Sequence, residues 1–287
     1  MGRNNIQSKM IEWIKHKYYW YHNHIKLKRF FYKRKELKIL FFGYPKSGNT
    51  WTRFLIYNYR NLLLNPNEEQ TVTYNRLNAL QNNIMEKGTT FLPEKGFPFI
   101  YRTHKIYKKN FDLFEKKIFI HRNPLDTLVS AYYYFKNRDV PFWDDPINVR
   151  EKLFDIDFFV KYKIDSWINF YYYSHQHADI VLNYSDMKNN CEKELFKLIQ
   201  FLGWELDKRL IMKSVKLSSF DNIRNMGKVM GQSHGMAKGG TGYGSFKGEF
   251  TRSGEESQFN HELKEETIKF VLNKFPDFKK IYPNLID

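Results

Sequence analysis

Short apolar runs alternate with longer amphipathic stretches along this chain of 287 residues. The runs are continuous and cover residues 38–42, 117–120 and 179–182. Continuous apolar runs of this length suit strands of a parallel sheet that is covered on both faces. The stretches between them, such as 50–64 and 124–138, have helical character. The pattern predicts an α/β fold, a single domain with a central parallel sheet flanked by helices and right-handed crossovers.

Two segments depart from this pattern. Residues 9–35 interleave basic and aromatic residues, with apolar positions near one helical face. We expect a helical arm over residues 1–37, followed by one domain over 38–287. The arm suits packing on the domain, and it also suits contact with an anionic membrane surface or an acidic substrate. Residues 227–257 contain nine glycines and predict a mobile loop that a ligand orders.

Charge and cysteine content narrow the classes of partner. The net charge is +16, and residues 1–38 hold eleven Lys and Arg against two Glu. This excess favours nucleotides, nucleic acid, acidic membrane surfaces or acidic glycans. Cys191 is the only cysteine, which excludes an internal disulfide and favours a reducing compartment. With no long apolar segment and no secretory signal, we expect a cytoplasmic protein, with the arm at the periphery of a membrane.

A candidate phosphate loop follows the first predicted strand. Residues 43–51 read Gly-Tyr-Pro-Lys-Ser-Gly-Asn-Thr-Trp and precede a predicted helix. Such a turn points backbone N–H groups at an anion, and the helix dipole adds attraction. Asn49 stands where a nucleoside-triphosphate loop needs lysine, and Lys46 lies instead at the crown of the loop. The loop predicts a nucleotide site in which the lysine points towards the group being transferred.

A second candidate anion site follows the second predicted strand. Arg122 precedes a helix with Pro124 in its first turn, and Ser130 lies about two turns further on. The two sites together resemble those of the sulfotransferases that use PAPS, 3′-phosphoadenosine 5′-phosphosulfate. The resemblance covers about residues 38–260. It implies a fold related to P-loop nucleotide kinases and a reaction that requires no metal.

The resemblance also implies which residues bind the donor. The phosphosulfate loop would comprise Pro45, Lys46, Ser47, Gly48, Asn49, Thr50 and Trp51. Arg122 would bind the 3′-phosphate through two N–H groups of its guanidinium, and the Ser130 hydroxyl would donate a hydrogen bond to the same phosphate. The adenine ring would contact Tyr184, Ser218 and Phe220, and the ring of Trp51 would lie on its other face.

The segment Tyr101-Arg102-Thr103-His104 resembles the family's catalytic Lys-Thr-His segment. His104 would be the general base, because imidazole titrates near neutral pH. Lys46 would stabilise charge on the bridging oxygen of the donor. Arg102 stands where the family often has lysine and keeps the charge with a different donor geometry. Ser130 completes the predicted catalytic set.

The C-terminal part departs from the family pattern. Lys238, Gly239 and Gly240 are the candidates for further contacts to the 3′-phosphate, although the arginine of the family motif is missing. Lys247, Thr251 and Glu256 fit the spacing of the family's dimer motif, but Arg252 replaces its valine. Loss of an apolar anchor from a small interface predicts a monomer or a weak homodimer.

We therefore predict a sulfotransferase that moves the sulfuryl group of PAPS to a hydroxyl or amine and releases the 3′,5′-bisphosphate PAP. The acceptor would be a small molecule, a glycan or a glycolipid. One alternative is a P-loop nucleotide kinase, which Asn49 disfavours. The other is a nucleic-acid-binding protein, for which the charge is the motive and no motif is present. The aromatic residues after Ser130 suit either an acceptor pocket or the core; they are Tyr132, Tyr133, Tyr134, Phe135, Phe142 and Trp143.

Overall fold

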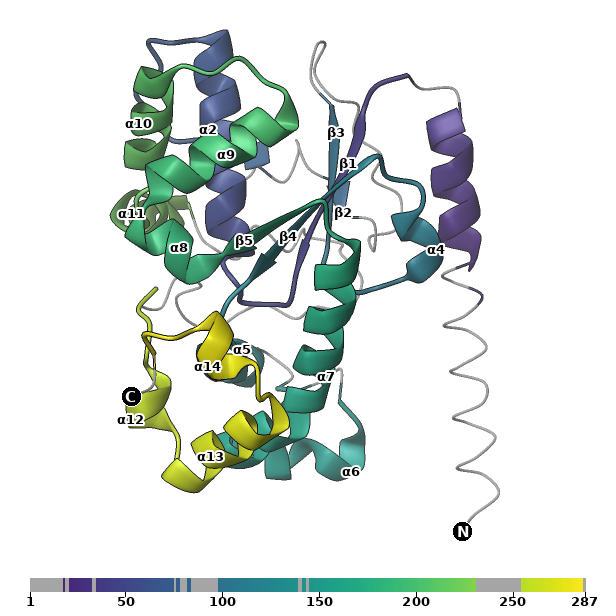
Figure 1. The fold of residues 1–287 in the computed structure, drawn as a ribbon, viewed down its shortest axis with the longest axis vertical. Helices are drawn as coiled ribbons and strands as arrows, with labels where there is room; N and C mark the ends of the chain where they lie inside the picture. The colour runs from purple at the N-terminus through teal and green to yellow at the C-terminus, as the bar shows by residue number, and fades with distance from the viewer. Residues whose placement is uncertain are drawn as a thin grey trace.

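The computed structural model describes residues 18, 21–32, 35–74, 76–77, 82–83, 98–138, 141–142, 145–230 and 254–285. Strands form one sheet in the order β2-β3-β1-β4-β5 (Figure 1). Their bounds are Lys38–Gly43 for β1, Asn82–Asn83 for β2, Phe99–Thr103 for β3, Lys116–His121 for β4 and Ile180–Asn183 for β5. Neighbouring strands are parallel throughout. The predicted α/β fold with a central parallel sheet is confirmed.

Three of these strands match the three apolar runs in the sequence. β3 did not stand out, because its sequence Phe-Ile-Tyr-Arg-Thr places Arg102 within the run. It pairs with the central strand β1, with Thr103 opposite Phe42. This pairing brings the end of β3 beside the loop that follows β1.

Helices cover both faces of the sheet. Ile39 and Phe41 of β1 belong to one buried cluster, together with α2 (Asn49–Leu64), α9 (Cys191–Leu202) and α10 (Lys208–Leu217). Leu40 and Phe42 belong to another, together with α5 (Pro124–Lys136), α7 (Ile156–His177) and α13 (Glu265–Lys274). Successive side chains of a strand point to opposite faces, so β1 is buried on both. The predicted helices at 50–64 and 124–138 are thus present as α2 and α5.

The other helices are α4 (Lys108–Phe111), α6 (Ile147–Arg150), η1 (Lys152–Phe154), α8 (Tyr184–Asn189), α11 (Phe220–Met230), α12 (Phe259–Glu262) and α14 (Phe278–Ile281). The predicted glycine-rich loop was wrong at its start, because α11 continues through Gly227 to Met230. A single glycine costs a helix only about 1 kcal/mol, which its neighbours offset. Residues 231–253 of that loop lie outside the described residues.

Within the N-terminal arm, residues 21–32 form a helix beside α4 (Figure 1). Leu27 and Phe31 are buried, and the Phe31 ring meets those of Tyr101 and Phe114 edge-on, with centroids 5.3 and 5.5 Å apart. The arm helix therefore packs on the domain through Leu27 and Phe31, whereas Tyr18 and Tyr21, which the sequence pattern placed on the apolar face, are exposed. Within the described part of the chain, no helix combines the length and the apolar character needed to cross a membrane.

Candidate functional site

The candidate phosphate loop connects β1 to α2 and depends on two glycines. A Cβ atom on Gly43 would lie 2.7 Å from the carbonyl oxygen of Ile120, and Gly48 has a φ of 97°. A Cβ atom on Gly48 would also lie 2.7 Å from the ring of Tyr184. Only glycine fits such positions without strain. Lys46, at the crown, has a φ of 72°, so the loop holds a lysine in the left-handed region as well.

Hydrogen bonds within the loop explain the asparagine at position 49. The Asn49 side-chain amide donates to the Tyr44 carbonyl at 2.9 Å, and the Ser47 N–H donates to the same carbonyl at 3.2 Å. Asn49 therefore braces the loop from inside, where a triphosphate loop would direct a lysine at phosphates. Its predicted contact with the donor stays a prediction.

Several features of the loop suit an anion. The first turn of α2 has no acidic residue and no side-chain cap, so its N–H groups and dipole point at whatever the loop holds. The Ser47 hydroxyl is buried and has no hydrogen-bond partner among the described residues. An unpaired buried hydroxyl is costly, and a phosphate oxygen is an acceptor that would satisfy it.

The predicted general base lies directly beside this loop. His104 follows β3, and its Nδ1 lies 2.8 Å from the Gly43 carbonyl oxygen. A carbonyl oxygen only accepts hydrogen bonds, so Nδ1 carries the hydrogen and Nε2 of the neutral ring has a free lone pair. Burial lowers the pKa of His104 to about 4, and the positive charges of Arg102, Arg53 and Lys46 act in the same direction. The ring is therefore neutral at physiological pH, with Nε2 ready to accept a proton.

Lys46 also meets the helix that carries Ser130. Its Nζ lies 5.0 Å from the ring centroid of Tyr134 on α5, within cation–π range. Ser130 lies one turn earlier on that helix and is half-buried. The structure thus brings Lys46, His104 and Arg102 into one electrostatic neighbourhood, with α5 facing the crown of the loop.

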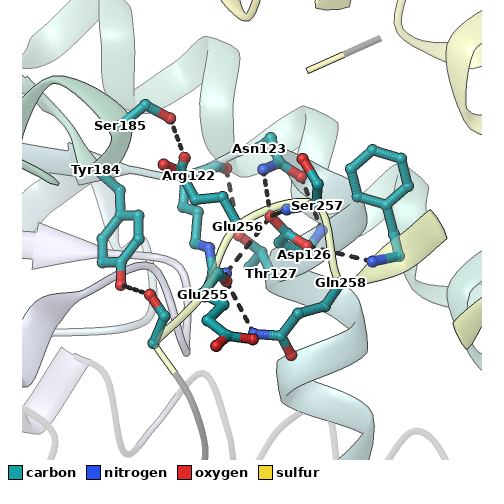
Figure 2. A network of polar contacts seen from close by, with 12 residues as sticks. Arg122, Asn123, Asp126, Thr127, Tyr184, Ser185, Glu255, Glu256, Ser257 and Gln258 are labelled. Carbon is teal, nitrogen blue, oxygen red and sulfur yellow. Dashed lines mark hydrogen bonds and ion pairs between the residues drawn. The ribbon is translucent and has the colours of Figure 1, made fainter. Parts of the chain in front are cut away.

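The second candidate anion site is a network of polar contacts around Arg122 (Figure 2). The Arg122 guanidinium is buried, lies over the ring of Tyr184 at 4.7 Å, and pairs with Asp126 at 3.4 Å. It also donates to the backbone carbonyl of Glu255. Asn123 caps α5 by accepting from the Asp126 N–H at 2.8 Å.

The predicted adenine contacts also come together. The rings of Trp51 and Tyr184 meet edge-on at 5.7 Å, and a Cβ atom on Gly254 would lie 2.9 Å from the ring of Phe220. Tyr184 donates through its hydroxyl to the Gly254 carbonyl at 2.9 Å. Ser218 is held differently, because its buried hydroxyl receives a hydrogen bond from Asn58 at 2.8 Å. The backbone carbonyl of Ser218 also accepts a hydrogen bond from the Trp51 indole N–H at 3.0 Å.

Some residues of this region were not predicted from the sequence, and others that were predicted lie outside the described residues. Asp126 was not predicted, because its only local signal is its place in the first turn of α5. Its contacts to residues 257 and 259 are more than 100 positions away in the sequence and leave no pattern. Lys238, Gly239 and Gly240 lie outside the described residues. Within the described ranges, no three His, Cys, Asp or Glu side chains are grouped to hold a metal ion.

Comparison with known proteins identifies the family. The family model described as the sulfotransferase domain matches residues 36–277. Sulfotransferase 1E1 of Bos taurus is 31% identical over 262 residues, which cover 79% of this chain and 83% of that protein. Sulfotransferase 2A1 of Rattus norvegicus is 26% identical over 262 residues, which cover 84% and 88%. The chain therefore belongs to the PAPS-dependent sulfotransferase family and is a transferase enzyme, as predicted.

Solved structures show the same fold. Mouse sulfotransferase SULT7A1 complexed with PAP has a TM-score of 0.51 at 19% identity, and the match covers 86% of each chain. Retinol dehydratase in a complex with retinol and PAP has a TM-score of 0.53 at 15% identity, covering 85% of this chain and 81% of that one. These likenesses support the sulfotransferase fold, and the P-loop kinase alternative is not favoured.

Proposed function

We propose that this sulfotransferase moves the sulfuryl group of PAPS with Lys46 and His104 at the reacting centre. The observation that carries the proposal is the 2.8 Å contact from His104 Nδ1 to the Gly43 carbonyl. It ties the base to the first residue of the loop that carries Lys46. Base and cation are thereby held together by the same turn of backbone.

In this proposal, the acceptor oxygen or nitrogen forms a bond to sulfur while the bond from sulfur to the bridging oxygen breaks. His104 Nε2 takes the proton that the acceptor loses. The electron pair of the broken bond stays on the bridging oxygen, where the Lys46 ammonium stabilises the charge. Arg102 adds positive charge nearby, and Ser130, half-buried on α5, is the remaining member of the proposed catalytic set.

The described residues fit the donor at each of its parts. The N-terminus of α2 and the unpaired Ser47 hydroxyl suit the 5′-phosphosulfate. Arg122 suits the 3′-phosphate, and the rings of Trp51, Tyr184 and Phe220 suit adenine. The two structural neighbours that hold PAP support PAP as the product. Roles for Lys238, Gly239 and Gly240 at the 3′-phosphate remain part of the proposal.

A small-molecule acceptor is favoured. Retinol dehydratase has been solved with retinol and with androsterone, both small molecules. Two of the aromatic residues considered for an acceptor pocket are instead core: Phe142 is fully buried, and Tyr132 is buried and donates to the Phe154 carbonyl at 2.7 Å. Tyr134, beside Lys46, is the member of that group that we propose faces the acceptor.

Ligand-induced stabilisation tests the proposed donor site. PAP should raise the Tm of the wild-type protein, whereas ATP with magnesium and a single-stranded oligonucleotide should not. Lys46→Ala should keep most of the shift with PAP and lose transfer from labelled PAPS to a panel of hydroxyl and amine acceptors. A shift with ATP and magnesium alone would contradict the proposal, as would full transfer by Lys46→Ala.

We also infer a peripheral membrane contact for the arm. Its helix exposes Tyr21 and Tyr32, at 53% and 87%, while Leu27 and Phe31 are buried. Lys108 and Lys109 of α4 are exposed and extend the basic surface of the arm. A contact of 3.0 Å between His24 and Asn110 joins α4 to the arm. Aromatic rings among cations suit an anionic bilayer. We propose a cytoplasmic enzyme that binds such surfaces reversibly.

Vesicle flotation tests the arm. The protein should float with phosphatidylserine-containing vesicles and not with phosphatidylcholine vesicles, and high salt should release it. Lys28→Gln with Tyr32→Ser should weaken flotation, whereas Lys188→Gln, an exposed lysine on α8, should not. Equal flotation of both variants would contradict the contact.

The oligomeric state is proposed to be a monomer or a weak homodimer. Glu256, the acidic member of the partial dimer motif, accepts a hydrogen bond from the Ser185 hydroxyl of its own chain. Its carboxylate is thereby engaged within the chain. Sedimentation velocity over a range of concentrations should give a monomer at low concentration, and a concentration-independent dimer would contradict the proposal.

A further inference from the structure

The segment 254–259 lies across the candidate 3′-phosphate site (Figure 2). The Gly254 carbonyl accepts from Tyr184, the Glu255 carbonyl accepts from Arg122, and the Glu256 carboxylate accepts from Ser185. Three successive residues are thus tied to the residues that we assign to the donor, or to their immediate neighbour. The segment continues into α12, which starts at Phe259.

Asp126 is the centre of this arrangement. Its carboxylate is fully buried and accepts from the Asn123 side chain at 2.8 Å, the Ser257 N–H at 2.9 Å and the Phe259 N–H at 3.4 Å. The fourth partner is the Arg122 guanidinium, at 3.4 Å. A carboxylate offers about four acceptor sites, so Asp126 uses its full capacity. One side chain therefore joins the start of α5, the segment 254–259 and Arg122.

Arg122 is consequently held on three sides. The ring of Tyr184 lies against its flat face, Asp126 lies beside Nη2, and the Glu255 carbonyl accepts from the same nitrogen. A guanidinium is planar and directional, so its value for a phosphate depends on its orientation. Burial removes the freedom to reorient that a surface arginine has. The group that fixes Nη2 therefore governs which way the remaining N–H groups point.

We propose that Asp126 is a positioning residue for Arg122 and that, with the segment 254–259, it sets how well the enzyme distinguishes a nucleotide 3′-phosphate from a 3′-hydroxyl. The inference rests on the proposed role of Arg122 at the 3′-phosphate. Asp126 itself touches no part of the donor in this proposal. Its carboxylate holds Nη2 so that the rest of the guanidinium is presented to the phosphate.

Equilibrium binding of two nucleotides tests the inference without any turnover. The ratio of the Kd for adenosine 5′-phosphate to the Kd for PAP measures what the 3′-phosphate contributes. Asp126→Asn should lower this ratio by about tenfold, the scale of one charge-assisted hydrogen bond, through weaker PAP binding alone. Ser185→Ala is the matched control, because it removes only the contact at Glu256 and leaves the contacts of the segment to Asp126 and Arg122 in place, so its ratio should not change.

A second variant covers the case in which Asp126→Asn does not fold. Asn123→Ser keeps a capping side chain for α5 but removes the donor from the Asn123 side chain to Asp126. It should lower the ratio in the same direction and to a smaller extent. Circular dichroism establishes that each variant is folded before binding is measured.

Three results would overturn the inference. An equal loss of affinity for both nucleotides would mean that Asp126 supports the fold alone, and an increased ratio, or unchanged affinities for both nucleotides, would mean that it does not orient Arg122. Arg122→Ala is measured in parallel and should remove most of the ratio. If Arg122→Ala leaves the ratio unchanged, the 3′-phosphate assignment itself fails, and the inference fails with it.

Discussion

The two anion sites of this enzyme are built in opposite ways. The phosphate loop is made of contiguous backbone, in which Gly43 and Gly48 allow a turn and the N-terminus of α2 supplies N–H groups. The Arg122 site is made of side chains from distant segments, joined at the buried carboxylate of Asp126. The first depends on backbone conformation, and the second on a network of hydrogen bonds.

Because the two sites are built differently, we expect substitutions in them to change different kinetic quantities. In the proposed function, the loop holds the group that is transferred, and the proposed base, His104, contacts the first residue of the loop. The Arg122 site is proposed to hold a phosphate that takes no part in the chemistry. Changes to the side chains proposed to react at the loop, Lys46 and His104, should therefore act on kcat, whereas changes at the Arg122 site should act on the affinity for the donor.

The largest expected effect comes from the base. His104→Ala should lower kcat by about 10²–10⁴-fold, because no other group is placed to take the acceptor proton in the proposed mechanism. The Kd for PAP should stay close to that of the wild type. Steady-state kinetics with labelled PAPS and calorimetric binding of PAP measure the two quantities.

Arg122→Ala should have the opposite pattern of effects to His104→Ala. It should weaken PAP binding and leave kcat at saturating donor much less affected than His104→Ala does. If both variants changed kcat and Kd to the same extent, the division of labour between the two sites would be wrong.

The contrast between the sites also explains what the sequence could predict. The phosphate loop lies within nine consecutive residues, and each constraint on it, from Gly43 to Trp51, is visible in the order of residue types. Arg122 and Ser130 were predicted for the same reason, since one immediately precedes a helix and the other lies about two turns into it. Asp126 was missed because its partners Ser257 and Phe259 are brought to it only by the fold.

The strands of the sheet were likewise predicted where their signal is local in the sequence. β1, β4 and β5 are continuous apolar runs, and their strand state is evident from local composition. β3 carries Arg102 and leads to His104, so its functional residues obscured its apolar pattern. Aromatic residues after Ser130 could not be divided into core and pocket, because Tyr132 and Tyr134 have the same chemistry and differ only in which neighbours the fold gives them.

An intermediate effect is expected from the backbone of the loop. Gly48→Ala should destabilise the protein by about 1–3 kcal/mol, since alanine would be strained at a φ of 97° and its Cβ would lie 2.7 Å from the Tyr184 ring. Gly203→Ala is the matched control, with a φ of 76° and no atom within 4 Å of the added Cβ. It should cost only the conformational term, about 1–2 kcal/mol.

Urea unfolding of the two variants and PAP binding by each measure this difference. Gly48→Ala should lose more stability than Gly203→Ala and should also bind PAP more weakly, because the strained residue precedes the N–H groups of α2. Equal losses of stability, with normal PAP binding in both, would contradict a backbone-built site.

The smallest expected effect is a displaced pH dependence. The pKa of His104 is lowered from 6.5 to about 4, first by burial and then by the positive charges around it. Between these values the folded state binds fewer protons than the unfolded state, so the stability that His104 contributes is present above pH 6.5 and is lost towards pH 4. The neutral base likewise persists as the pH falls through 6.5. We therefore expect kcat to hold nearly constant from pH 7.5 to about pH 5.5.

The measurement requires kcat at saturating PAPS, because a phosphate monoester has a second pKa near 6 and would impose that value on the binding of the donor. An acid limb centred near pH 6.5 would mean that His104 titrates as an ordinary exposed histidine. Arg102→Gln sharpens the test. Removing a positive charge should raise the pKa of His104 and move the acid limb upward, and Arg102→Lys should leave it in place. Because burial is the larger cause, the pKa of His104 in the Arg102→Gln variant should remain well below 6.5. A full return of this pKa to 6.5 would mean that charge, and not burial, lowers it.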